Sequence, residues 1–178
     1  KQKTAYEIMP SLVGSEMCIR DSPHTAGCIV NKQHACFLGA TEVDIDFNVN
    51  VNTHSDGLLL HGIGGHQDAA AGSDITVILA PLLRGRIPVI RKEVTTVSTP
   101  GDIVDVVVTE KGIAINPKRE DLIEALKGMP IVDIKDLYKK AVGLAGEPKK
   151  PRFGDDVVAI TEFRDGTVLD EIRGVKGW

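Results

Sequence analysis

The residues best suited to chemistry in this 178-residue sequence lie in one short stretch, GIGGHQDAAAGSD at positions 62–74. Gly62, Gly64 and Gly65 lack a Cβ atom, so their backbone N–H groups can come close to a bound molecule and adopt positive φ angles. A short helix is expected to follow at residues 67–72. The turn and helix would form a concave set of N–H donors for a carboxylate, a thioester oxygen or a phosphate. The alternative is a tight turn or a close strand crossing without a ligand.

Two nucleotide-binding motifs do not fit this stretch. A dinucleotide fingerprint needs a third glycine where Gln67 stands, and an acidic residue about 20 positions on, where the region near Leu82 has none. A P-loop needs Gly-Lys-Ser or Gly-Lys-Thr, which the sequence lacks. The glycines therefore predict neither type of site.

Histidines and carboxylates near the glycines suggest a metal site at first. His54, His61 and His66, with Asp56 and Asp68, are ordinary ligand types, but the histidine spacings match no helical ligand pair. Polar surface or loop roles are therefore favoured, and no metal is expected. His66 is the exception, because beside the glycines it could donate to a carbonyl oxygen or act as an acid or base near neutral pH.

Two further groups of charged residues alternate along the chain. Arg84 and Arg86 follow a β-type run, and arginine forks suit the carboxylates of a polyanionic substrate, although a solvated face is slightly favoured. Glu42, Asp44 and Asp46 alternate likewise. They could do acid or base work, or form the polar side of a strand end.

The composition restricts the class of protein. A hydrophobic content of 42% with 4% aromatic residues predicts a core of Val, Ile, Leu and Ala, as in α/β proteins. A net charge of −4 without a basic stripe excludes nucleic acid as the main partner. Three cysteines, at positions 18, 28 and 36, fit a reducing cytoplasm. No apolar run approaches the roughly 20 residues needed to cross a bilayer.

The positioning elements are mostly strands. Short apolar or β-branched runs predict strands at 35–41, 47–52, 75–82, 95–99 and 104–109. In residues 47–52, Phe and Val alternate with Asn, which predicts one buried face and one polar face.

Two helices and a hairpin follow. Asn116 and Gly128 bound the first expected helix. The second, at 133–146, would turn an apolar stripe inward, composed of Ile134, Leu137, Ala141 and Leu144. An Asp165-Gly166 turn predicts a closing hairpin. The order indicates an α/β fold, with a mixed β-sheet covered by helices.

The first segment, residues 1–22, has no apolar region of a signal peptide and no clear period. It resembles a translated adapter from assembled environmental DNA. We therefore expect a non-native extension over 1–22 and a single domain over 23–178.

Three longer phrases carry a family resemblance: GATEVDIDFNVNVNTHSDG, GIGGHQDAAAGSDITVILAPLLRGRIPVI and VTTVSTPGDIVDVVVTEKGIAINPKREDLIEAL. Together they resemble the C-terminal domain of citrate lyase alpha chains. Their skeleton is also similar to the wider coenzyme A transferase superfamily. The resemblance implies a coenzyme A transferase-like (NagB/RpiA/CoA transferase-like) domain over 23–178 whose upstream domain is missing, so that the piece alone would be inactive.

The resemblance also implies a reaction. The acetyl group of an acetylated acyl carrier protein would be exchanged for citrate, which gives citryl-carrier protein and acetate. The carrier would bear a phosphoribosyl-dephospho-coenzyme A arm, and acetyl-coenzyme A could replace it. Partners would be the beta subunit, a citryl-carrier lyase, and the gamma subunit, the carrier itself. A related citramalate-type transferase and a non-catalytic assembly module are the alternatives.

Site residues follow from the same resemblance. In relatives with a covalent glutamyl intermediate the glutamate lies upstream of this region, and citrate lyase alpha chains are thought to use direct attack by a citrate carboxylate. The catalytic residue is therefore left open, with His66 and Glu42 as candidates. The expected binding residues are Asn48, Asn50, Gly62, Gly64, Gly65, His66, Asp68, Arg84 and Arg86.

Overall fold

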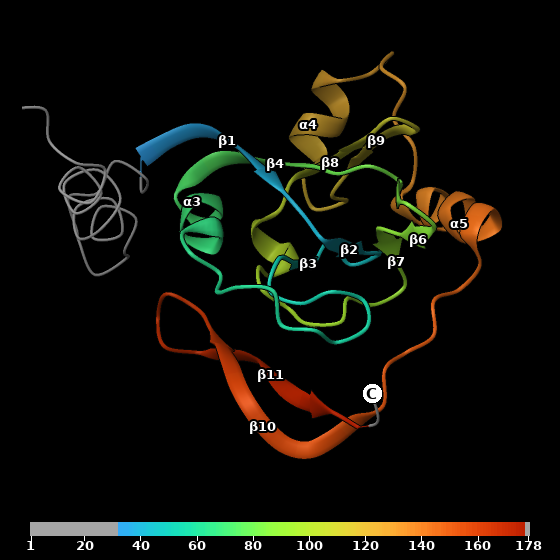
Figure 1. Ribbon diagram of the computed structural model, residues 1–178. Coiled ribbons are helices and arrows are strands. Elements are labelled where there is room, and N and C mark those ends of the chain that lie inside the picture. Colours follow the sequence, from blue (N-terminus) through green and yellow to red (C-terminus); the bar gives the residue numbers. More distant parts are fainter. Residues whose placement is uncertain (1–31, 177–178) are drawn as a thin grey trace, which may run out of the picture.

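The structure is a computed structural model that describes residues 32–176 (Figure 1). Its main sheet has the order β1-β4-β8-β9, formed by Gln33–Gly39, Ser73–Leu79, Val106–Thr109 and Gly112–Ile115. β1, β4 and β8 run parallel, and β9 returns antiparallel to β8. The strands expected at 35–41, 75–82 and 104–109 are therefore confirmed, and β9 is an additional one.

The main sheet buries one face. Inward side chains include Cys36, Ile78, Val107 and Ala114, which are at most 7% exposed. Helix α3, His66–Ala71, lies on this face, where the Thr76 hydroxyl donates to the Ala70 carbonyl at 3.1 Å. The short helix expected after the glycines is thus confirmed.

The chain forms a second, smaller sheet after β1. Its order is β3-β2-β7, formed by Val49–Asn50, Glu42–Asp44 and Ile90–Arg91. A hairpin of β5, Leu83–Arg84, and β6, Ile87–Pro88, precedes β7. These strands place residues 42–50 and 91 beside one another.

The segment 47–52 departs from the expected strand. Only residues 49–50 pair, because Phe47 adopts a left-handed backbone with φ of 66°. Asn50 and Asn52 are 0% and 3% exposed, so the polar face is buried and is satisfied by hydrogen bonds rather than by water.

The strand expected at 95–99 is wrong. The segment is irregular apart from an isolated bridge between Thr99 and Val49. Thr96 and Ser98 are buried, and their hydroxyls bond to Thr53 and Asn52. The hydroxyl groups of this segment therefore form side-chain hydrogen bonds to other segments, and the backbone does not form a regular strand. A 3-10 turn, Gly101–Ile103, follows.

The second expected helix is present in the structure as α5. α5, Ile134–Ala145, begins at the N-cap Asp133, and its Ile134, Leu137 and Ala141 are buried. Leu144 was expected to point inward but is 66% exposed.

The first helix, α4, is shorter than expected and covers only Glu120–Ala125, with Arg119 as the N-cap residue. The expected cap Asn116 is wrong. Its side chain instead donates to the carbonyls of Gly101 and Val104 at 2.9 and 2.8 Å.

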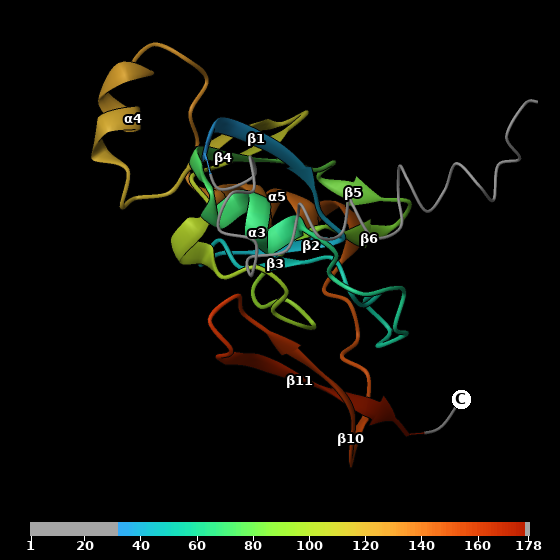
Figure 2. The same ribbon diagram turned by 90° about the vertical axis from the view of Figure 1, so that its left-hand side faces the viewer.

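The final hairpin is confirmed. β10, Phe153–Glu162, pairs antiparallel with β11, Val168–Val175, around Gly166 at φ 88°. Figures 1 and 2 show it on the far side of the molecule from β1 and β4. It is tied back to the body by Gln67 Nε2, which donates to the Glu162 carbonyl at 2.5 Å, and by the Thr161 hydroxyl, which donates to the Val97 carbonyl at 2.8 Å. Within residues 32–176, no helix is long and apolar enough to cross a membrane.

Candidate functional site

The glycine turn lies open at the start of α3. Gly64 has φ of 61°, a conformation that L side chains rarely adopt. A Cβ atom built on Gly62 or Gly64 would meet no described atom within 4 Å. Gly65, the N-cap of α3, has an ordinary φ of −92°. Close packing within the described residues is therefore not the reason for glycine at positions 62 and 64. The space beside their Cα atoms is open to a ligand.

His66 ties the glycine turn to two other segments. Its Nε2 lies 2.9 Å from the carbonyl of Gly39, at the carboxyl end of β1, and its Nδ1 lies 2.7 Å from the Thr99 hydroxyl. A carbonyl only accepts, so Nε2 carries the proton and Nδ1 accepts from Thr99. Burial lowers the pKa of His66, and the bond to Gly39 only partly offsets this. Both ring nitrogens of His66 are thus engaged, and the lowered pKa favours the neutral ring.

Arg84 reaches the same strand end. Its Nη2 donates to the carbonyl of Ala40 at 2.9 Å, one residue beyond the carbonyl bound by His66. Arg86 is exposed in the turn between β5 and β6. His66 and Arg84 thus bond to the carbonyls of two consecutive residues at the carboxyl end of β1.

Glu42 lies elsewhere, in a closed polar cluster. It is 0% exposed, and Arg91 forms an ion pair with it. Its Oε1 also accepts from the hydroxyls of Ser55 and Thr95, and its Oε2 accepts from Asn50 Nδ2 and the Thr95 N–H, at 2.7–3.1 Å. Burial alone would raise the pKa of Glu42, but Arg91 and the hydrogen bonds hold it below its usual value. Both carboxylate oxygens of Glu42 are thus occupied by partners from within the described residues.

Asn50 belongs to the same cluster. Besides Glu42, its Nδ2 donates to Thr53, and its Oδ1 accepts from the backbone N–H groups of Asn52 and Thr53 at 3.0 Å. Asn50 therefore has no free polar atom for a ligand.

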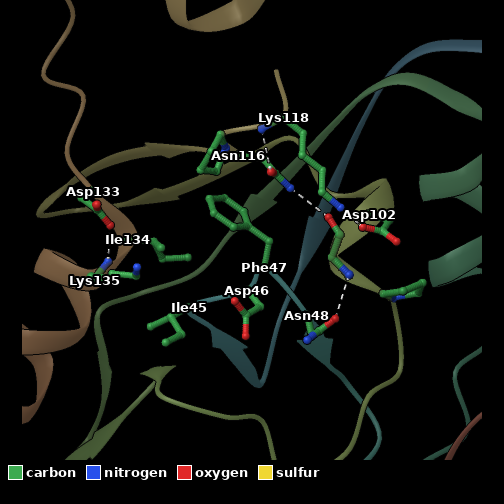
Figure 3. Close-up of a pocket in the computed structure, with 13 residues that line it drawn as sticks. Ile45, Asp46, Phe47, Asn48, Asp102, Asn116, Lys118, Asp133, Ile134 and Lys135 are labelled. Atoms are coloured by element: carbon green, nitrogen blue, oxygen red, sulfur yellow. Dashed lines mark hydrogen bonds and ion pairs between the residues drawn. The ribbon is translucent and has the colours of Figure 1, made fainter. Parts of the chain in front are cut away.

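Asn48 lines a separate cavity of about 410 Å³ (Figure 3). Its Oδ1 accepts from the Gly101 N–H at 2.9 Å, and its Nδ2 donates to Asp44. Burial raises the pKa of Asp44, and the hydrogen bonds from Asn48 work against that rise. Gly101 is needed there, because a Cβ would lie 2.0 Å from the Asp46 carbonyl oxygen. Asn48 holds two loops together.

Asp68 faces the tip of the final hairpin. It is 6% exposed and lies 4.0 Å from Arg164 Nε. Both residues line a hollow of about 380 Å³ between α3 and residues 162–166. Asp68 thus links α3 to the hairpin.

Sequence reasoning missed the partners of these residues. Thr99 orients His66, and Arg91 neutralises Glu42. The signal for Arg91 was Glu42 itself, since a carboxylate inside a strand needs a buried cation. No comparable signal marked Thr99 within the TTVST run.

Comparison with known proteins identifies the family. A model described as citrate lyase, alpha subunit (CitF), matches residues 17–175. The chain belongs to the citrate lyase alpha subunit family. It is 50% identical to the citrate lyase alpha chain of Klebsiella pneumoniae over 157 residues, which are 87% of this chain. It is 46% identical to that of Escherichia coli K12 over 152 residues, 84% of this chain.

A solved structure agrees with the fold. The alpha subunit of citrate lyase from Streptococcus mutans, in complex with citrate, aligns with 88% of this chain at 47% identity and a TM-score of 0.84. The expected α/β fold and family are thereby confirmed. The chain spans only about a third of its relatives, 31% of the Klebsiella chain and 31% of the Streptococcus structure.

Proposed function

We propose that residues 32–176 form one wall of the site in which citrate displaces acetate from an acetyl thioester. The observation that carries this proposal is the open glycine turn, which His66 ties to the carboxyl end of β1, where Arg84 bonds to the next carbonyl. The family membership and the citrate in the Streptococcus mutans relative support the substrate class.

The chemistry follows from these groups. A citrate carboxylate oxygen attacks the acetyl carbonyl carbon, the thiolate leaves, and a citric–acetic anhydride forms. The thiolate then attacks the citryl carbonyl carbon and acetate leaves, so no atom or electron is gained or lost. Negative charge develops on a carbonyl oxygen in both steps, and the exposed N–H groups around Gly64 and Gly65 are suited to stabilise it.

The other residues have supporting roles. Arg84 and Arg86 are available for citrate carboxylates, which arginine binds with two parallel hydrogen bonds. His66 fixes the turn through its bonds to Gly39 and Thr99, and neither step of the exchange needs a proton transfer from it. The thioester would be borne by an acyl carrier protein or by coenzyme A, and the beta and gamma subunits of a citrate lyase would be the partners.

The test uses a chimera, in which residues 32–176 replace the matched region of the Klebsiella pneumoniae alpha chain. Acetate release from acetyl-coenzyme A is measured with citrate and with citramalate, beside the unaltered Klebsiella chain. Gly65→Val should lower turnover by about 100-fold, because the side chain enters the space where the oxyanion forms. Its φ of −92° permits valine, but valine is a poorer N-cap residue than glycine, so the thermal midpoint is measured beside turnover to separate lost folding from lost catalysis.

Gly143→Val is the matched control. Gly143 lies in α5 with nothing within 4 Å of its Cβ position, and this variant should keep its turnover. Turnover of Gly65→Val within about twofold of the chimera would refute the role of the turn. A chimera that unfolds cooperatively yet releases no acetate with citrate would refute the proposed reaction, and release with citramalate alone would change the substrate.

A further inference from the structure

The final hairpin of β10 and β11 holds two segments that lie far from it in the sequence. It bonds to both backbone groups of Val97: the N–H donates to Asp170 Oδ2 at 2.9 Å, and the carbonyl accepts from the Thr161 hydroxyl at 2.8 Å. On α3, Gln67 Nε2 donates to the carbonyl of Glu162 at 2.5 Å. Figures 1 and 2 show the tip of the hairpin beside α3 in both views. The hairpin therefore grips α3 and the segment that contains Val97 at the same time.

Thr99 and His66 join the same two segments directly. Thr99 is 0% exposed, and its hydroxyl donates to His66 Nδ1 at 2.7 Å. The backbone of Thr99 is fixed by Val49, because each residue donates its N–H to the carbonyl of the other at 2.9–3.0 Å. The contacts thus close a ring that runs from the hairpin through Val97 and Thr99 to His66, and from α3 through Gln67 back to the hairpin.

This ring holds the start of α3, and the glycine turn comes directly before it. Gly65 is the N-cap of α3, and its carbonyl accepts from the Ala69 N–H at 2.9 Å, so turn and helix share a backbone hydrogen bond. No described atom lies within 4 Å of a Cβ built on Gly62 or Gly64. Because side-chain packing does not hold these glycines among the described residues, the place of the turn depends on the helix start, and so on the ring.

From this ring we infer that the final hairpin positions the acyl-transfer site, and that Thr161 acts on the glycine turn through Val97, Thr99 and His66. The inference rests on the proposed function, since it gives the hairpin a part in that reaction. Neither Thr161 nor Thr99 touches the reacting atoms. Both are positioning residues, whose loss displaces the N–H groups that face the oxyanion.

Such a role has a kinetic signature. Groups that stabilise a transition state must be held to within about 0.5 Å of their productive position. The oxyanion exists only in the transition state and in the short-lived tetrahedral intermediate, so a displaced turn lowers kcat. The KM values for citrate and acetyl-coenzyme A should change little, because they do not depend on that charge.

The first test measures acetate release by the chimera described above. Thr161→Val removes the hydroxyl and keeps the shape of the side chain, and it should lower kcat by about threefold, as expected for one neutral hydrogen bond. Thr99→Val acts directly on His66 and should lower kcat by about tenfold. Both KM values should stay within about twofold. Thr161→Ser and Thr99→Ser restore the hydroxyl and should restore kcat.

Thr109→Val is the matched control. Thr109 is 8% exposed and its hydroxyl donates to the Gly112 carbonyl at 3.0 Å, outside the ring, so this variant should keep its kcat. Because Thr161 acts through Thr99, the double variant should be no slower than Thr99→Val alone. A double variant that loses about 30-fold, the product of the two single effects, would overturn the inference. A kcat of Thr161→Val equal to that of Thr109→Val would overturn it too.

A second measurement needs no activity and separates this inference from the proposed function. In ¹⁵N relaxation of the 178-residue chain, Thr161→Val and Thr99→Val should lower the backbone order parameters of Gly65 and His66 from about 0.85 toward about 0.6, and Thr109→Val should not. Unchanged order parameters in both variants would overturn the inference. Lowered order parameters together with full turnover of Gly65→Val would support the ring as the support of the turn and refute the proposed function instead.

Discussion

The buried pair of Glu42 and Arg91 offers the sharpest test of the energetics. Arg91→Met removes the cation and keeps much of the side-chain volume. Breaking a buried pair by removing one partner costs about 3–5 kcal/mol, because the other charge stays buried. Four neutral hydrogen bonds to Glu42 remain, from Ser55, Asn50 and twice from Thr95, and they still stabilise its charge. We therefore expect the free energy of unfolding to fall by about 3 kcal/mol at pH 7.5, the lower end of that range.

The loss should depend on pH in a defined direction. In the unaltered chain the pKa of Glu42 is lower in the folded than in the unfolded state. Glu42 therefore contributes to folding stability above its unfolded-state pKa, and this contribution is lost as pH falls through its folded-state pKa. Without Arg91, burial raises that pKa, so the folded variant takes up a proton more readily than the unfolded chain. The variant should therefore be closer to the unaltered chain at pH 5 than at pH 7.5.

Urea unfolding of the 178-residue chain and its variants at both pH values measures this. Arg173→Met is the control, because Arg173 pairs with Glu171 on the surface, with both side chains more than 40% exposed. It should cost less than about 1 kcal/mol. A loss for Arg91→Met equal to that of the control, or a loss independent of pH, would refute the argument that Glu42 is held charged by Arg91.

Two further predictions concern backbone and proton positions. In long-range ¹⁵N–¹H spectra, His66 should show the Nε2–H tautomer and a pKa below the ordinary histidine value. Because the buried ring resists protonation, the folded state should lose stability as pH falls below about 6.5. An Nδ1–H tautomer would contradict the assigned hydrogen bonds. Gly101→Ala should destabilise the chain by at least about 2 kcal/mol in urea, because its Cβ would strike the Asp46 carbonyl. Gly143→Ala, a helical site with open space, should instead be neutral or stabilising, and similar losses for both would refute the close contact.

Local patterns predicted the regular elements well. Apolar runs indicated β1, β4 and β8, and the Asp165-Gly166 turn indicated the final hairpin, because each pattern acts within a few residues. The polar segments were harder. Residues 95–99 have the composition of a strand, yet their hydroxyls bond to distant side chains, and no pattern within the segment encodes those partners.

The candidate site was predicted in part. His66, beside the glycine turn, and Arg84 bond to consecutive carbonyls at the end of β1, and their part in a site stays a prediction. Asn50 and Glu42 were counted with them because of the family resemblance, but both lie in a closed cluster, on either side of the turn at Phe47 with its positive φ. Such a turn on a non-glycine residue depends on tertiary contacts, and sequence periodicity does not reveal it.

The final hairpin also affects the order in which the site can be completed during synthesis. Gln67 and Glu162 are joined across 95 positions, and Thr161 holds Val97 across 64. Chains are made from the amino end at about 5–20 residues per second, so the glycine turn leaves the ribosome several seconds before the hairpin that fixes it. Until then the turn and residues 94–99 lack these ties, and a chain stalled before the hairpin would present an unassembled site to chaperones and proteases.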